Sequence, residues 1–175
     1  MVYRADVVGS LLRPAWLKDA RSAWQQGTLP APEFKRIEDR AVDAAIAQQE
    51  AVGVDVITDG ELRRGTFLGP LVDTVDGFGP TDEVIGAQRH WRTPAGPARP
   101  GATQGFAITG KLRRRRSLAA EEFTYVRARA RKPAKVTLPS PLMLSLLWSR
   151  KYSATAYPIL IVGERRRWNI HLRRE

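Results

Sequence analysis

The chain has 175 residues, 43% of them hydrophobic and 27% charged, which is typical of one globular domain and excludes a fibrous or wholly disordered protein. No apolar run approaches the roughly 20 residues that span a bilayer, and the N-terminus lacks a signal-peptide pattern, so we expect a cytoplasmic protein without membrane contact. The net charge of +11 favours phosphate-rich partners, yet the basic clusters lack the interleaved aromatic residues of a stacking platform, so nucleic-acid binding is not the leading expectation.

A short apolar run, Val7-Val8, opens the pattern and is followed by Gly9-Ser10. This order is typical of a buried parallel strand that ends in a loop whose backbone approaches a ligand. A helix is expected after Pro14, through Trp16 to Trp24, and Gly27 is placed to end it.

The segment from Glu33 to Val52 is the clearest predicted helix, and Gly53 is placed as its C-terminal cap. Residues at helical spacing form its predicted face: Ile37, Ala41, Ala44, Ala45 and Gln48. The β-branched segment 54–58 predicts a strand that runs directly into Asp59-Gly60-Glu61, a turn with two carboxylates.

The segment from Val72 to Gly105 is rich in Gly, Pro and polar residues without a sustained period, which predicts an irregular surface excursion. Strands are expected at 106–110 and 135–138. A helix is expected between them over 118–131, with acidic residues in its first turn and basic residues in its last. The segment from Leu142 to Trp148 predicts the start of another helix.

This order of strands and helices predicts an α/β fold whose strands are adjacent and mostly parallel. A barrel and a doubly wound sheet both fit the pattern, although no glycine-rich dinucleotide fingerprint is present. In a barrel, the loops after the strands build the active site, which makes Ser10, Glu61, Ser140 and Trp148 the positions of interest.

Three segments resemble, in order, the catalytic barrel of cobalamin-independent methionine synthase and its short bacterial relatives. The stretch from Val7 to Pro14 is similar to the family's Gly-Ser opening, and the stretch from Ala45 to Glu61 is similar to a block that ends in Gly-Glu. The third stretch runs from Ile108 to Trp148 and includes Lys135-Val136-Thr137-Leu138-Pro139-Ser140-Pro141. The resemblance implies that residues 1–157 are the N-terminal half of a TIM (β/α)8 barrel, a partial barrel with parallel strands, and that 158–175 are a divergent basic tail.

The resemblance also implies a methyltransferase of methionine biosynthesis, which moves a methyl group from 5-methyltetrahydropteroyltriglutamate to homocysteine. Gly9 and Ser10 would then bind the homocysteine carboxylate, and Glu61 its ammonium group. Trp148 would lie against the pterin of methyltetrahydrofolate, because a flat aromatic face suits a flat heterocycle. A relative that acts on another thiol, such as coenzyme M, is an alternative.

Each role has a structural alternative. Ser10 could only terminate a strand, Glu61 could be a solvated loop carboxylate paired with Arg63 or Arg64, and Trp148 could belong to the core. A different class of function is a basic nucleic-acid or phosphate-binding module that uses Arg113 to Arg116. That function would appear as DNA affinity with a steep salt dependence.

The family's zinc ligands, a histidine, two cysteines and a glutamate, come from the later half of its barrel. This chain has no cysteine, and His90 and His171 lack matching neighbours, so we interpret both as structural or solvent-facing and expect no metal or other cofactor in this chain. The chain is therefore expected to be inactive alone and to self-associate through an open barrel edge, unless a separate chain covers it. From Ile159 onward the sequence departs from the family, which indicates a shifted reading frame or a truncated gene, with a short divergent natural ending as the alternative.

Overall fold

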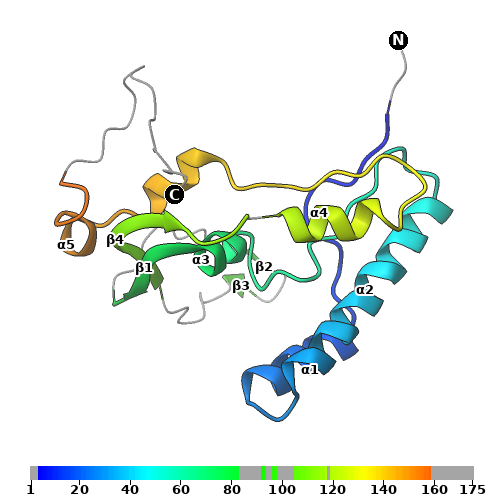
Figure 1. Ribbon diagram of the computed structural model, residues 1–175, viewed down its shortest axis with the longest axis horizontal. Helices are drawn as coiled ribbons and strands as arrows, with labels where there is room; N and C mark the ends of the chain where they lie inside the picture. The colour runs from blue at the N-terminus through cyan, green and yellow to red at the C-terminus, as the bar shows by residue number, and fades with distance from the viewer. Residues whose placement is uncertain (1–3, 83–91, 94–95, 98–104, 118, 159–175) are drawn as a thin grey trace. The chain divides into compact units, whose positions relative to one another are not determined.

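The computed structural model describes residues 4–82, 92–93, 96–97, 105–117 and 119–158 (Figure 1). His90, His171 and the predicted tail beyond Pro158 lie outside the described residues. The chain divides into two compact units. Unit 1 comprises Met1–Pro70 and Ser117–Leu138, and unit 2 comprises Leu71–Arg116 and Pro139–Glu175.

Two consecutive helices form much of unit 1 and lie side by side (Figure 1). Helix α1 spans Ala15–Gln25, and the positive φ of Gly27, 75°, turns the chain after it. Helix α2 spans Ala31–Ala51, with a proline in its first turn and Gly53 at a φ of 86° just beyond its end. The sequence prediction of both helices is therefore confirmed, because these end signals are local.

The buried face of α2 differs from the predicted one. Ala41 and Ala45 are buried as expected, whereas Ala44 and Gln48 are exposed. The buried residues of the helix are Phe34, Glu38, Ala41, Val42, Ala45, Ile46 and Gln49. The larger apolar side chains of Val42 and Ile46 gain more from burial than Ala44 does, so the helix turns this side toward a core that also contains Leu17, Ile57 and Val126.

The extended segments of unit 1 meet in parallel at isolated bridges. Asp6 pairs with Val56, and Ile57 pairs with Ala134. Ile57 N donates to the Pro133 carbonyl over 2.8 Å, and Lys135 N donates to the Ile57 carbonyl over 2.9 Å. Segment 54–58 thus lies between 5–6 and 133–135, but within the described residues these contacts do not extend into long parallel strands.

Two features of unit 1 correct the predicted boundaries. Val8 is exposed over 89% of its surface, so the prediction of a buried strand at Val7-Val8 was wrong. Helix α4 spans Ala120–Arg127, which is shorter than the predicted 118–131, although both acidic residues, Glu121 and Glu122, lie in its first turn as expected.

Unit 2 contains an antiparallel strand pair that the sequence did not predict. Strand β1, Val75–Thr81, pairs with β4, Gly105–Arg114. The predicted strand at 106–110 is therefore confirmed, but the expected parallel pairing was wrong, and residues 75–81 of the predicted irregular segment form a strand. Gly77 sits at the register shift with a φ of 98°, and a Cβ there would lie 2.7 Å from the Lys111 carbonyl oxygen. Glycine and proline are uncommon in strands, so the sequence of β1 does not predict a strand. Its strand conformation depends on pairing with β4, which is distant in the sequence.

The remaining elements are short. Helix α3 spans Gly69–Thr74 where the chain passes from one unit to the other, and strands β2 (Arg92–Thr93) and β3 (Gly96–Pro97) pair antiparallel. The segment Pro141–Leu147 forms a 3-10 helix, η1, where the start of another helix was predicted from Leu142, and α5 spans Arg150–Ser153. In the described part of the chain, no helix has the length and apolar character that crossing a membrane requires.

Candidate functional site

Glu61 occupies a tight turn that follows the central extended segment of unit 1. Its backbone has a φ of 54°, in the left-handed region that non-glycine residues rarely adopt, and Gly60 before it has a φ of 67°. Thr58 Oγ1 accepts a hydrogen bond from Gly60 N, and Asp59 Oδ1 accepts one from Glu61 N, each over 3.0 Å. Such a backbone costs about 1–3 kcal/mol and persists only where the surroundings enforce it, which is often at a functional site.

A buried glutamine anchors the start of this turn to α2. Gln49 Nε2 donates to the Thr58 carbonyl over 2.8 Å, and Gln49 Oε1 accepts from Thr58 N over 3.0 Å. The side-chain amide therefore pairs with the backbone of residue 58 as a neighbouring strand would. The sequence interpretation missed Gln49, although it lies within the segment Ala45 to Glu61 that carries the family resemblance.

Ser10 and Glu61 come together across a long stretch of chain. The Ser10 hydroxyl donates to Glu61 Oε2 over 2.6 Å, although the two residues are 51 positions apart. Ser10 is exposed and follows Gly9, whose φ is 83°, whereas Glu61 is only 4% exposed. Glu61 is therefore not the solvated loop carboxylate of the structural alternative, and the roles of Gly9, Ser10 and Glu61 in substrate binding stay predictions.

The second oxygen of Glu61 is held from another segment. Thr137 Oγ1 donates to Glu61 Oε1 over 2.5 Å, and Arg64 Nη1 lies 3.1 Å from the same hydroxyl oxygen. Arg64 Nη1 also lies 3.9 Å from Glu61 Oε1. The guanidinium is fixed by Glu122 of α4, whose Oε2 accepts from Arg64 Nη2 over 2.6 Å. Sequence reasoning missed Thr137, because nothing in its neighbourhood marks it as a partner of Glu61.

A second arginine holds the backbone of the turn. Arg13 Nη2 donates to the carbonyl oxygens of Glu61, over 2.9 Å, and of Arg64, over 2.8 Å. Because one guanidinium nitrogen spans both carbonyls, the segment from 61 to 64 is fixed relative to the loop that carries Ser10.

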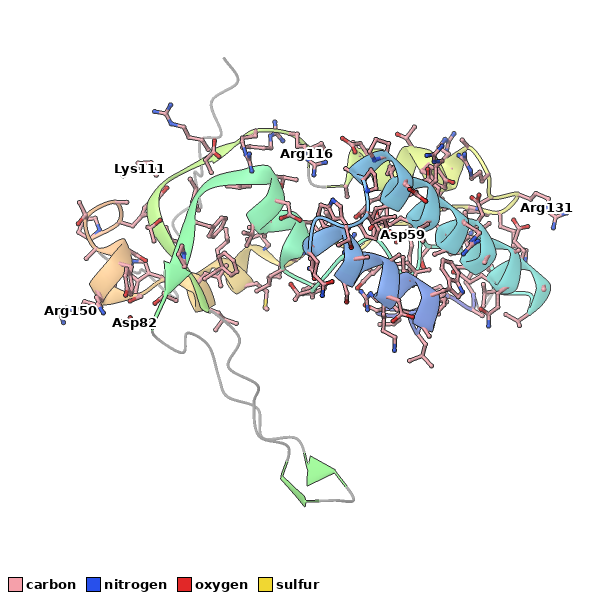
Figure 2. The ribbon with its side chains drawn as sticks, turned by 90° about the horizontal axis from the view of Figure 1, so that it is seen from below. Asp59, Asp82, Lys111, Arg116, Arg131 and Arg150 are labelled. Atoms are coloured by element: carbon pink, nitrogen blue, oxygen red, sulfur yellow. The ribbon has the colours of Figure 1, made fainter. Side chains whose placement is uncertain are left out.

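The two carboxyl groups of the turn have opposite electrostatic environments. Burial opposes the ionisation of Glu61, but hydrogen bonds from Ser10 and Thr137 and the charges of Arg64 and Arg13 hold its pKa below the ordinary value. Burial raises the pKa of Asp59, which is labelled in Figure 2, and its Oδ2 has no hydrogen-bond partner among the described residues. Glu61 is thus maintained as an anion that can accept further donors.

Trp148 belongs to unit 2. Its indole Nε1 donates to the Tyr157 carbonyl over 3.0 Å, and the side chain is half-buried beside the buried Leu147. This bond fixes the indole to the segment that follows α5. Contact between Trp148 and a pterin stays a prediction, as does a role for the exposed Ser140.

The described residues do not fit the zinc site that the family implies. In the described ranges, no group of three or more His, Cys, Asp or Glu side chains lies together in a way that could hold a metal ion. The whole sequence also lacks the cysteines that such a site requires.

Comparisons with known proteins agree on one family. The profile described as "Cobalamin-independent synthase, Catalytic domain" matches residues 4–138. The Bacillus subtilis protein YxjH, described as uncharacterized, is 33% identical over 144 residues, which are 81% of this chain and 36% of YxjH. The 5-methyltetrahydropteroyltriglutamate–homocysteine methyltransferase of Syntrophotalea carbinolica is 27% identical over 150 residues, 17% of its length.

Two solved structures have a similar fold. A Listeria monocytogenes chain assigned as a vitamin-B12 independent methionine synthase has a TM-score of 0.59 and 30% identity, over 83% of this chain and 39% of that one. A B12-independent methionine synthase from Shewanella, solved in complex with selenomethionine, has a TM-score of 0.56 and 21% identity, over 80% of this chain and 38% of that one. The chain therefore spans well under half the length of these relatives.

Proposed function

The chain belongs to the cobalamin-independent methionine synthase family, and on that premise we propose that unit 1 binds the amino-acid end of a homocysteine-like thiol for methyl transfer. The observation that carries the proposal is the hydrogen bond of 2.6 Å between Ser10 and Glu61. It places a hydroxyl donor beside a carboxylate that its neighbours keep ionised. An α-amino acid presents the complementary pair, a carboxylate and an ammonium group.

Binding would exchange the partners of this pair. A serine hydroxyl has one proton to donate, so Ser10 cannot serve Glu61 and a ligand carboxylate at once. In the proposed complex the ligand ammonium donates to Glu61 Oε2, and Ser10 turns its proton to the ligand carboxylate beside Gly9. One hydrogen bond within the protein is broken, and two charge-assisted hydrogen bonds to the ligand form.

The charge of the site favours an amino-acid thiol over coenzyme M. Coenzyme M carries a sulfonate and no ammonium group, so it would offer Glu61 a like charge and no donor. The selenomethionine of the Shewanella complex has the amino and carboxylate groups that the proposed site requires. This supports homocysteine, with methionine as the methylated product.

Methyl transfer needs more than the binding of the amino acid. The thiol must lose its proton, its sulfur must form a bond to the methyl carbon, and the bond from that carbon to the folate nitrogen must break, with that nitrogen keeping the electron pair and taking up a proton. We propose that unit 1 binds and orients the acceptor, that Trp148 supplies a platform for the pterin, and that this chain alone does not complete the transfer.

We further propose that unit 1 is part of a (β/α)8 barrel. The parallel bridges of Ile57 and Val56 to the flanking segments support this arrangement. So do the exposed apolar side chains of Val8, Leu12 and Leu138, which the other strands and helices of such a barrel would cover.

A comparison of two ligands tests the proposed function. L-Homocysteine should bind the full chain more tightly than 4-mercaptobutanoate, which differs only by loss of the amino group. Because a charge-assisted hydrogen bond contributes about 1.5–3 kcal/mol, the difference should be tenfold or more in calorimetric or NMR titrations. Equal affinity for the two ligands would refute binding through the ammonium group.

A further inference from the structure

We infer that Thr137 is a positioning residue for Glu61: its hydroxyl can only donate to the carboxylate, and it thereby keeps Glu61 ionised and oriented for a cationic group. The inference rests on the proposed function for the identity of that group. The hydrogen-bonding role itself follows from the contacts of unit 1 and can be tested without a ligand.

The direction of each hydrogen bond follows from the chemistry of the donors. A guanidinium has five N–H donors and no acceptor, so Arg64 Nη1, 3.1 Å from Thr137 Oγ1, must donate to it. The threonine oxygen is then an acceptor toward Arg64, and its single proton is left for Glu61 Oε1 at 2.5 Å. This separation is typical of a hydroxyl that donates to an ionised carboxylate.

The arginine that imposes this direction cannot easily turn away. The Arg64 side chain is only 2% exposed, and Glu122 accepts from both its Nη2, over 2.6 Å, and its Nε, over 3.4 Å. Glu122 belongs to α4, and Arg64 lies 58 positions earlier in the turn region. The chain of bonds from Glu122 through Arg64 and Thr137 to Glu61 therefore joins three separate segments.

This arrangement penalises protonation of Glu61. Ser10 donates to Oε2 and Thr137 to Oε1, so a proton on either oxygen would meet a donor and break one hydrogen bond. Arg64 and Arg13 add positive charge near the carboxylate, whereas the neighbouring carboxyl group of Asp59 has the opposing effect. Ser10 is exposed and can be drawn away by a ligand, whereas Thr137 is bound to Arg64 and stays a constant donor.

The test is a pH titration of the Glu61 carboxyl by NMR in full-length protein labelled with 13C-glutamate, with Glu61→Gln to assign the signal. Thr137→Val, which keeps the shape and removes the hydroxyl, should raise the pKa of Glu61 by about one unit. Thr137→Ser, which keeps the hydroxyl, should restore the wild-type titration. Thr137→Ala is a second variant without the hydroxyl in case the valine variant does not fold.

An unchanged titration in the folded valine or alanine variant would overturn the inference. So would a serine variant that titrates like valine, because the methyl group and not the hydroxyl would then matter. The proposed function is tested separately. Equal affinity of wild-type protein for L-homocysteine and 4-mercaptobutanoate would refute the proposed function, whatever effect Thr137 has on the titration of Glu61.

Discussion

The hydroxyl of Ser10 lies 2.6 Å from Glu61 Oε2 and donates to it, which joins two loops 51 positions apart in the sequence. Each loop leaves an extended segment of unit 1, and those segments are themselves joined by the parallel bridge between Asp6 and Val56. The fold therefore brings an exposed hydroxyl into contact with a buried carboxylate.

Replacement of Ser10 by alanine should weaken homocysteine binding. The ligand carboxylate would lose its donor, which predicts a roughly fivefold to tenfold loss of affinity in calorimetric titration. Ser22→Ala in α1 is the matched control, because Ser22 is also exposed and its hydroxyl donates only to the Lys18 carbonyl. A loss of the same size in both variants would argue against a specific role for Ser10.

Gln49→Ala should destabilise unit 1 by about 2–3 kcal/mol, because it leaves the buried N–H and carbonyl of Thr58 without partners. The neighbouring Gln48→Ala is the control, since Gln48 is exposed on the same helix and should change stability by less than about 0.5 kcal/mol. Urea unfolding of both variants measures the difference. Similar midpoints and slopes would mean that the amide does not anchor the turn.

Gly60→Ala should cost about 1–3 kcal/mol in the free energy of unfolding. The φ of 67° strains any side chain, and a Cβ at this position would lie 3.0 Å from Leu11 Cδ1. At Gly65 a Cβ would meet nothing within 4 Å, so Gly65→Ala serves as the control. The midpoint of thermal unfolding of Gly60→Ala should be well below that of Gly65→Ala. The reverse order would contradict the described geometry of the turn.

Asp59→Asn should become more stable relative to wild type as the pH rises. Burial raises the pKa of Asp59 above its model-compound value of 3.8, so folded protein binds this proton more tightly than unfolded chain does. The resulting stability is fully present at pH values below the pKa of Asp59 in the unfolded chain. It is lost as the pH rises through the pKa of Asp59 in the folded protein. Asparagine keeps an acceptor for Glu61 N and has no carboxyl to ionise.

The measurement for Asp59 is the free energy of urea unfolding from about pH 4 to pH 7 for both proteins. The stability of Asp59→Asn relative to wild type should increase across this range. The pKa shift of Glu61 has the opposite sign. Its lowered pKa contributes stability at pH values above the pKa of the unfolded chain, and this stability is lost as the pH falls through the pKa of the folded protein. A constant difference between Asp59→Asn and wild type would show that Asp59 does not titrate in this way.

Local signals predicted the helices and the positions of Ser10 and Glu61. Gly27 and Gly53 lie just beyond the ends of α1 and α2, and the acidic turn follows a β-branched segment directly. These features depend on residues that are close in sequence, so composition and spacing suffice to find them.

Features that depend on distant partners could not be predicted in the same way. Strand β1 contains two glycines and a proline, and only its pairing with β4 makes it a strand. Gln49 and Gln48 are alike in the sequence, and which one is buried depends on how α2 packs. Thr137 lies 76 positions from Glu61, and its role becomes visible only when Arg64 fixes the direction of its hydroxyl.

The most direct test of the central claim is a double-mutant cycle between Glu61 and the ligand amino group. Affinities of wild type and Glu61→Gln are measured for L-homocysteine and 4-mercaptobutanoate, with Glu33→Gln, an exposed carboxylate of α2, as the control protein. If Glu61 binds the ammonium group, Glu61→Gln should lose roughly tenfold or more in affinity for homocysteine and little for the desamino ligand. Equal losses for both ligands in folded Glu61→Gln would contradict the account.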